Sequence, residues 1–295
     1  MFLVIGSLVV LGSVIGGYLM HHGELAVLIQ PNELLIIGGA AVGSLVIATP
    51  ATVLKHMMGQ VMGLFGSGIG KADYLELLGM QYQLFKTVQQ AGVMALESHF
   101  EDPEKSAILT KYPKFLTRHH ALEFLADSVK VIIIGGISAH DLESLMDEDI
   151  EIAHHEELRP SGALRTMSDA FPGLGIVAAV LGIIITMGAI DGPPAEIGEK
   201  VAAELVGTFL GILLCYGFAG PAASAMEARV NDDGRYVVCI KTGLLAVYKG
   251  FPPAIAVEFA RRVLPADVRP TFDETEIYCK ALGKGGEAGG EAVAA

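Results

Sequence analysis

Residues 171–190 read FPGLGIVAAVLGIIITMGAI, a run of twenty residues without Asp, Glu, Lys, Arg or His. Residues 1–20, 34–54 and 205–226 are uncharged runs of similar length. The hydrocarbon core of a bilayer is about 30 Å thick, and a helix that rises about 1.5 Å per residue needs about 20 apolar residues to cross it. The sequence therefore predicts an all-α, polytopic membrane protein with four transmembrane helices and a helical cytoplasmic domain.

The four runs divide the chain into four parts. We expect transmembrane helices 1 and 2 in residues 1–54, joined as a hairpin by a short external turn, and a helical cytoplasmic loop domain in residues 55–170. Residues 171–226 should hold transmembrane helices 3 and 4. Residues 227–295 should form cytoplasmic helices and a disordered tail, because the sequence GKGGEAGGEAVAA has too little apolar content to fold.

Composition narrows the class of protein. The chain has 295 residues, 52% of them hydrophobic, and a net charge of −13, so a nucleic acid partner is not expected, since phosphates are bound by clustered Lys and Arg. Cys215, Cys239 and Cys279 are too scattered for a disulfide framework or a zinc site and should be reduced thiols. The N-terminus lacks the positive segment and the cleavage site of a signal peptide, so the first run should be retained as a membrane helix.

The distribution of positive charge predicts the orientation. Of the 20 Lys and Arg, ten lie in residues 55–170 and nine follow residue 226, which leaves only Lys200 for the short connections. The side of a membrane that is rich in Lys and Arg is the cytoplasmic side. Both large segments and both termini are therefore expected in the cytoplasm.

Helical periodicity appears in both charged segments. In the loop, apolar spacing predicts one amphipathic helix from residue 74 to near Glu97, a second over 121–134 that stops at two glycines, and an acidic third helix with Asp141 as its N-cap. After the fourth span, the pattern continues to the Pro-Pro pair at 252–253. A short helix follows over residues 254–264.

Small residues within the spans predict close helix packing. Gly-x-x-x-Gly pairs occur at 12 and 16, at 39 and 43, and at 207 and 211. Each pair clears one face of its helix of side chains, so that a neighbouring helix can approach. Packing, and not the lining of a pore, is the expected role of these glycines.

No acid, His or Lys lies within any of the four spans. The nearest acids are Glu33, Asp191 and Glu204, which we expect to be solvated at the external ends of the helices. If the protein handles ions, a partner chain must supply the titrating group.

Hydroxyls and prolines are the remaining polar or irregular features of the spans. A helical hydroxyl ordinarily bonds to the carbonyl four residues earlier or to a neighbouring helix. Pro172 fits the first turn of the third span, where its missing N–H costs nothing, and Pro221 should tilt the end of the fourth.

Neither catalytic nor metal chemistry is indicated. Helical spacing gathers Glu151, His155 and Glu156, but a third well-placed ligand is not evident, and a solvated helix is expected there. None of the common nucleotide-binding, hydrolase or metalloprotease motifs occurs in a usable context. We expect no enzyme activity, no cofactor and no metal site.

Four segments closely resemble the MotA family of flagellar motor stator proteins, within the MotA/TolQ/ExbB proton channel family. They are MDEDIE (146–151), SDAFPGLGIVAAVLG (168–182), ELVGTFLGILLCYGFAGP (204–221) and PPAIAVEFARRVLP (252–265), and the N-terminal LVVLGSVIGGYLM (8–20) is similar too. The resemblance covers nearly the whole chain, in order.

The resemblance implies a multi-pass subunit of the bacterial inner membrane, surrounded by lipid, that converts proton motive force into torque. Several copies, a pentamer in this family, surround a dimer of MotB, whose single span carries an aspartate and whose periplasmic domain grips peptidoglycan. Protons are the coupling ion and pass between the third and fourth spans and that aspartate.

Residue roles are carried over by position. Thr208 matches the threonine that faces the MotB helix, and Pro172 and Pro221 match two prolines that couple protonation to cytoplasmic movement. Ala179 stands where sodium-driven relatives have a threonine, which favours protons because a methyl group cannot coordinate sodium. Tyr216 is placed with these residues on the ion pathway.

The resemblance also implies contact with the rotor protein FliG through two charged residues spaced eight apart. Glu97 occupies the acidic position, but Gln89 replaces the usual Arg. Lys86, on a nearby face of the same helix, can substitute for it.

Three alternative functions remain. An energiser of outer-membrane processes of the ExbB or TolQ type usually has three spans, not four. A non-conducting membrane scaffold would tolerate changes at Thr208 or Pro172. An autonomous channel would conduct ions alone, which the absence of an acid within the spans opposes.

Overall fold

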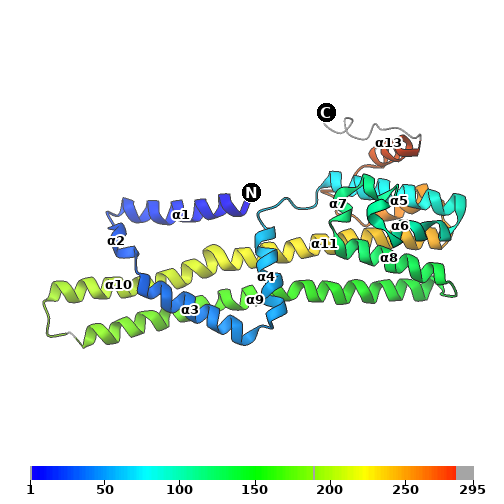
Figure 1. Cartoon of the computed structure of the whole chain (residues 1–295). Helices are drawn as coiled ribbons and strands as arrows, with labels where there is room; N and C mark the ends of the chain where they lie inside the picture. The colour runs from blue at the N-terminus through cyan, green and yellow to red at the C-terminus, as the bar shows by residue number, and fades with distance from the viewer. Residues whose placement is uncertain (1, 189, 284–295) are drawn as a thin grey trace. The chain divides into compact units, whose positions relative to one another are not determined.

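The computed structural model describes residues 2–188 and 190–283, and every regular element within these ranges is helical (Figure 1). The chain forms two compact units. Unit 1 contains the residues up to 67 and residues 157–230, and unit 2 contains residues 68–156 and those from 231 onward. Two long helices, α9 (Ala139–Met187) and α11 (Gly220–Tyr248), contribute one end to each unit.

Four helical stretches are long and apolar enough to cross a membrane. They are Leu3–Met20, Leu25–Ala48, Ala139–Met187 and Pro194–Tyr248. Each contains one of the four uncharged runs or most of it, so the prediction of an all-α protein with four transmembrane helices is confirmed.

Unit 1 is a helical bundle. Besides its parts of α9 and α11 it contains α1 (Phe2–Met20), α2 (Leu25–Leu28), α3 (Pro31–Ala48), α4 (Ala51–Gly63), α10 (Pro194–Leu213) and the π-helical turn η4 (Leu214–Ala219). In Figure 1, α3 lies along α9 and α10. Ile37 and Ala41 of α3 are fully buried there, in one cluster with Phe171 and Ala178 of α9 and Cys215 of η4.

The first span packs differently from the second. A Cβ atom on Gly217 of η4 would meet Val10 of α1, so α1 contacts η4, whereas α3 packs against α10. No residue of the span Leu3–Met20 is buried among the described residues. The predicted short connection between the first two spans is present and contains α2, but the two helices it joins have different packing partners.

Helix α4 was not expected from the sequence, because its first four residues were counted with the second span and the others with the cytoplasmic loop domain. Val53 and Met57 are buried, and Met57 shares a cluster with Leu164 of α9. The Arg229 guanidinium donates to the carbonyl oxygens of Gly63 (2.5 Å) and Ser67 (2.7 Å). A cation at the C-terminus of α4 satisfies carbonyls that have no helical partner.

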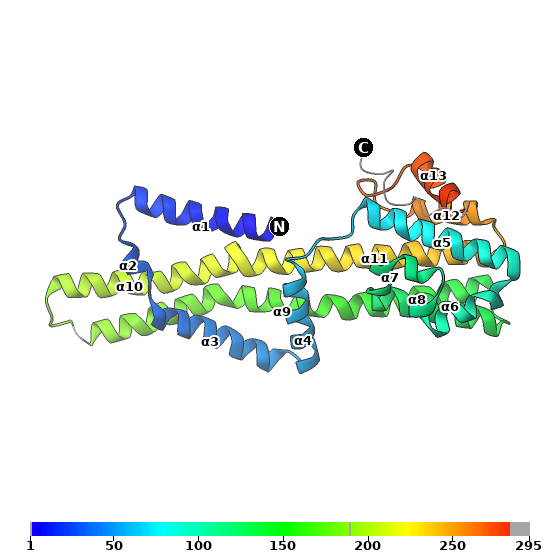
Figure 2. The same cartoon turned by 45° about the horizontal axis from the view of Figure 1, so that its top comes forward.

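Unit 2 is a second, separate helical core (Figure 2). Its elements, besides the parts of α9 and α11, are α5 (Lys71–Ala91), η1 (Val93–Leu96), α6 (Glu97–Glu101), η2 (Pro103–Lys105), η3 (Leu109–Lys111), α7 (Pro113–Leu116), α8 (His119–Ile134), α12 (Pro253–Arg262) and α13 (Phe272–Gly283). Helix α5 is central and packs against α12 and α13. Gly243 of α11 lies against it, and a Cβ atom there would be 3.1 Å from the ring of Phe85.

The predicted helix from residue 74 to near Glu97 is shorter in the structure. Helix α5 ends at Ala91, and Gly92 has φ +82°, a conformation that glycine adopts readily and other residues rarely do. A 3-10 turn follows, and Glu97 begins the separate helix α6. The prediction was wrong because the apolar residues keep a helical spacing on both sides of Gly92, although the helix itself ends there.

The N-cap of the acidic helix was also misplaced. Ser138 Oγ accepts a hydrogen bond from the Asp141 N–H at 3.1 Å and donates one to the Asp141 carboxylate at 2.6 Å. Ser138 is therefore the N-cap, and Asp141 lies three residues later, where its carboxylate accepts from the Ser138 hydroxyl. The predicted helix end at residues 135–136 is confirmed, since α8 stops at Ile134 and both glycines have positive φ.

The C-terminal segment contains one helix more than expected. The helix at 254–264 is present as α12, and α13 follows it. Thr271 and Glu274 bond reciprocally at the start of α13, and Lys71 binds the Glu274 carboxylate at 2.7 Å. These bonds, with that from Lys71 the strongest, lower the pKa of Glu274 to about 2. The Thr-Phe-Asp-Glu sequence is the capping signal that could have found α13. The predicted disordered tail lies almost wholly outside the described residues.

Candidate functional site

The third and fourth spans cross at three glycines. A Cβ atom on Gly175 of α9 would lie 2.7 Å from the Gly207 carbonyl oxygen and 3.2 Å from the Gly211 Cα of α10. A Cβ atom on Gly211 would lie 2.5 Å from the carbonyl oxygen of Phe171. The two backbones therefore touch, which only glycine permits, and the predicted packing role of Gly207 and Gly211 is confirmed.

The other two Gly-x-x-x-Gly pairs have no such neighbour. No heavy atom of a different described element lies within 4 Å of a Cβ atom built on Gly12, Gly16, Gly39 or Gly43. Within the part of the chain that the structure describes, close packing is therefore limited to the third pair.

Thr208 lies at this crossing. Its Cα is 3.3 Å from the Cβ position of Gly175, and its side chain is half-buried. Its hydroxyl forms none of the hydrogen bonds found among the described residues, whereas Ser44 and Thr166 bond back to carbonyls of their own helices. Thr208 therefore keeps its hydroxyl free of the back-bond that is ordinary for a helical threonine.

Pro172 does not occupy a first helical turn. It lies deep inside the 49-residue helix α9, together with Pro160, so the prediction of an N-terminal position was wrong. A proline inside a helix removes one backbone hydrogen bond and disturbs the preceding turn. The sequence placed the helix start near Phe171 because charge stops there, but the backbone of α9 is continuous from residue 139.

Pro221 also lies within a continuous helical stretch. It follows the π-helical turn η4, which joins α10 to α11. Such turns and prolines are the usual causes of irregularity in long helices. We expected Pro221 to tilt the end of a helix. It lies instead beside an irregular turn in the middle of the helical stretch from residue 194 to 248.

Ser168 joins the two proline regions. Its buried hydroxyl donates to the carbonyl oxygen of Cys215 in η4 at 3.2 Å. Ser168 is four residues before Pro172, and the Cβ position of Gly220, next to Pro221, is 3.4 Å from Ser168 Oγ. This contact was not predictable from the sequence, because Ser168 lies outside the uncharged run and its partner is a backbone atom.

Replacing Ser168 with alanine should lower the free energy of unfolding by about 1 kcal/mol, the usual net value of one hydrogen bond. Thermal unfolding of the purified chain in detergent measures the change. Ser44→Ala is the matched control, since Ser44 is exposed and bonds only within α3, and it should change stability by less than about 0.5 kcal/mol. Equal stability of the two variants would show that the Ser168 hydrogen bond does not stabilise the contact between α9 and η4.

Ala179 and Tyr216 have opposite environments. Ala179 is buried in α9, one turn after Gly175, next to the fully buried Ala178 that packs on Gly207. Tyr216 of η4 is 73% exposed, so its ring does not enter the packed bundle of this chain.

The three residues predicted to contact the rotor lie in unit 2 on two different helices. Gln89 is exposed near the end of α5, and Lys86 is half-buried one turn before it. Glu97 is exposed at the first position of α6. The end of α5 at Gly92 separates Gln89 from Glu97, so their eight-residue spacing does not place them on one helix face.

Two of the three acids near the span ends are not solvated. Asp191 is exposed as expected, but Glu33 of α3 and Glu204 of α10 are only 8% and 7% exposed. The Thr186 hydroxyl of α9 donates to Glu204. The prediction of solvated acids at 33 and 204 was wrong because position along a helix gives depth, whereas packing decides which face is covered.

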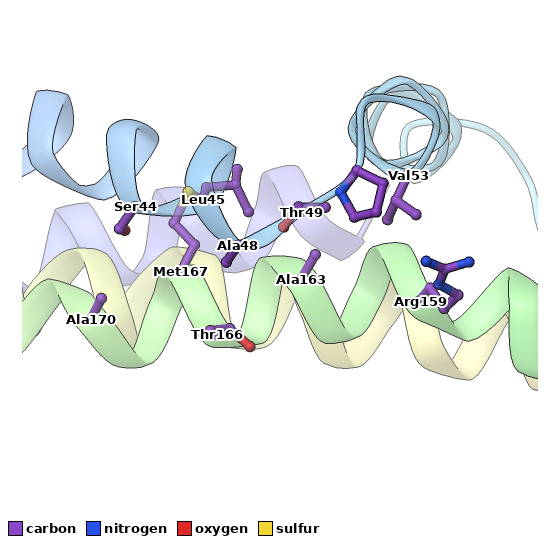
Figure 3. A pocket seen from close by; sticks show the side chains of 11 residues that line it. Ser44, Leu45, Ala48, Thr49, Val53, Arg159, Ala163, Thr166, Met167 and Ala170 are labelled. Carbon is purple, nitrogen blue, oxygen red and sulfur yellow. The ribbon is translucent and has the colours of Figure 1, made fainter.

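A pocket of about 430 Å³ lies between α3, α4 and α9, within unit 1. Figure 3 shows its largely apolar lining, with Thr49 facing Ala163, Thr166 further along α9, and Arg159 below Val53. None of the predicted ion-pathway residues lines it.

Comparison with known proteins identifies the family. Residues 4–92 match the family described as Motility protein A N-terminal, and residues 117–236 match the MotA/TolQ/ExbB proton channel family. The chain is 40% identical to Motility protein A of Escherichia coli over 96% of both chains. It is also 40% identical to chemotaxis protein LafT of Vibrio parahaemolyticus, over 92% of this chain and 96% of that protein.

Solved structures show the same fold. The MotAB structure of C. jejuni matches with a TM-score of 0.74 at 18% identity, covering 90% of this chain and 96% of that one. The MotAB stator complex of Bacillus subtilis matches with a TM-score of 0.69 at 22% identity, covering 89% and 95%. The chain therefore belongs to the motility protein A family, the flagellar stator subunits within the MotA/TolQ/ExbB proton channels.

Proposed function

We propose that this stator subunit works with MotB, whose membrane aspartate accepts the protons that drive rotation. The observation that carries the proposal is the crossing of α9 and α10. It presents the Thr208 hydroxyl, which bonds to no described residue, beside glycine backbones, and residues 171–187 and 205–226 contain no acid that could titrate. A partner helix seated near Thr208 supplies the missing carboxylate.

The two irregular helices provide the mechanical part of the proposal. Ser168 ties the turn before Pro172 to the turn before Pro221, so a shift of one is transmitted to the other. Both α9 and α11 continue from unit 1 into unit 2. A change in charge on the MotB aspartate is thereby converted into movement of the long helices, and unit 2 delivers torque to FliG through Glu97, Gln89 and Lys86.

Assembly and orientation follow the same proposal. The largely exposed apolar surface of α1 suits contact with lipid or with other chains, as a pentamer around a MotB dimer requires. Unit 2 and both termini lie in the cytoplasm, where the excess of Lys and Arg places them. Protons are the coupling ion because Ala179 offers no oxygen to sodium.

Deletion of the gene tests the function. Flagella should still assemble, but cells should not swim, because one proton that crosses 100 mV supplies about 2.3 kcal/mol and no other subunit would use it. Swimming should return with the wild-type gene, stop with a protonophore and be independent of external sodium. Swimming that persists without the gene, in cells with no second stator, would disprove the proposal.

Thr208→Ala separates the stator from a passive scaffold. A scaffold would keep its function, because the change removes one oxygen that bonds to no described residue.

A further inference from the structure

Side chains from three helices lie close together near the loop that joins α9 to α10. They are Glu33 of α3, Thr186 of α9 and Glu204 of α10, which are 8%, 2% and 7% exposed. The Thr186 hydroxyl donates a hydrogen bond to Glu204 Oε1. The Glu33 carboxylate packs against Gly207, which lies one turn after Glu204 in α10.

Two glycines make room for the acids. A Cβ atom on Gly207 would collide with the Glu33 carboxylate, and one on Gly182 of α9 would collide with the Glu204 side chain. Each acid therefore lies directly against a glycine, and a larger residue at that position would displace it.

One oxygen of each acid has no partner. Glu33 Oε2 and Glu204 Oε2 are both buried, and neither accepts a hydrogen bond from any described residue. The titratable groups on the surrounding elements are exposed and join none of the ion pairs among the described residues. These groups are His21, His22 and Glu24 before α2, Asp191 after α9, and Glu196, Glu199 and Lys200 in α10.

Two ionised carboxylates cannot share such a site at low cost. Burial without a cation or a full set of hydrogen-bond donors disfavours the charge of each acid, and the two charges repel. A single proton removes one charge and gives the remaining carboxylate a donor, as in other buried carboxyl pairs. We propose that Glu33 and Glu204 hold one proton between them and form an acid pair that belongs to this chain.

A proton fits the site better than a metal ion does. The Thr186 hydroxyl is already used as a donor to Glu204, and two carboxylates alone supply fewer oxygens than a bound cation needs. Uptake forms one O–H bond on a carboxylate oxygen and release breaks it, with no other change in bonding.

The use of this proton rests on the proposed function. In the orientation proposed above, the acid pair lies on the external side of the bundle and takes up protons before they reach the MotB aspartate. The existence of the shared proton and its use in rotation are separate claims, and they are tested separately.

Infrared spectroscopy of the purified chain in lipid tests the shared proton. At neutral pH the wild-type chain should show the C=O band of one protonated carboxylic acid per chain, and the band should shift or disappear in both Glu33→Gln and Glu204→Gln. Glu199→Gln, an exposed change in the same helix, should leave the band intact. A band that stays unchanged in either pair variant, or is displaced by sodium, overturns the proposal. If a variant does not fold, the wild-type chain still provides a test, because it should contain one protonated carboxylic acid.

Swimming tests the use of the proton. Glu204→Gln should cause loss of swimming with normal amounts of protein in the membrane, whereas Glu199→Gln should swim as the wild type does. If the band is lost and swimming persists, the acid pair is not on the pathway. If the wild type itself proves not to be proton-driven, the proposed function fails while the shared proton stands.

Discussion

Replacing Gly211 with valine is expected to abolish swimming. The Cβ atom would lie 2.5 Å from the Phe171 carbonyl oxygen and 3.0 Å from the Gly175 Cα. Both are backbone atoms that cannot rotate away, so α9 and α10 must separate. Overpacking of a tight core costs about 1–3 kcal/mol, and a collision between two backbones belongs at the upper end. When α9 and α10 separate, the distance between them at Thr208 also changes.

The measurement combines soft-agar swimming with thermal unfolding of the purified chain. Gly162→Val is the matched control, because Gly162 is in α9 of the same unit and no heavy atom of another described element lies within 4 Å of its Cβ position. The control should unfold at the wild-type temperature or above, since valine favours a helix more than glycine does. Normal swimming and stability in Gly211→Val would show that the crossing is not close-packed.

Replacing Phe85 with alanine is expected to destabilise unit 2 by about 3–5 kcal/mol, the usual cost of removing a buried phenylalanine. Its ring is 2% exposed and fills the space between α5 and Gly243 of α11. Domains are stable by only about 5–15 kcal/mol, so this is a large fraction of the total.

The thiol of Cys239 reports the loss. Cys239 is fully buried in the same core, and burial raises the pKa of its thiol, so it reacts only when unit 2 opens. Labelling should accelerate about a hundred-fold or more in Phe85→Ala, because each 1.4 kcal/mol is a factor of ten. Gln89→Ala, an exposed change on the same helix, should leave the rate within about two-fold. Similar rates in the two variants would contradict the assignment of Phe85 to the core.

The helices of unit 2 show how far local patterns reach. The end of α8 was predictable because two adjacent glycines stop a helix through their own conformation. The end of α5 at Gly92 was missed, since apolar spacing on both sides is helical and a single glycine is tolerated within many helices. The capping signals at Ser138 and Thr271 were present in the sequence but were not recognised.

The candidate site divides in the same way. Its residue types were evident from the sequence, because a span without acids and a glycine pair beside Thr208 are visible in the letters themselves. The residues that these side chains contact were not evident from the sequence. Ser168 meets a carbonyl 47 residues away, and the burial of Glu33 depends on α10, which lies more than 160 residues later in the chain.

The sequence by itself determined that this chain is helical and crosses a membrane four times, because hydrophobic length and charge act locally along the chain. It also determined the family, since the resemblance depends on residues in order. Only the tertiary structure decided which glycine pair brings helices together, that Pro172 and Pro221 lie inside continuous helical stretches, and that Glu33 and Glu204 are buried as a pair. Those outcomes depend on which faces of distant helices pack against each other, and periodicity along one helix does not specify its neighbour.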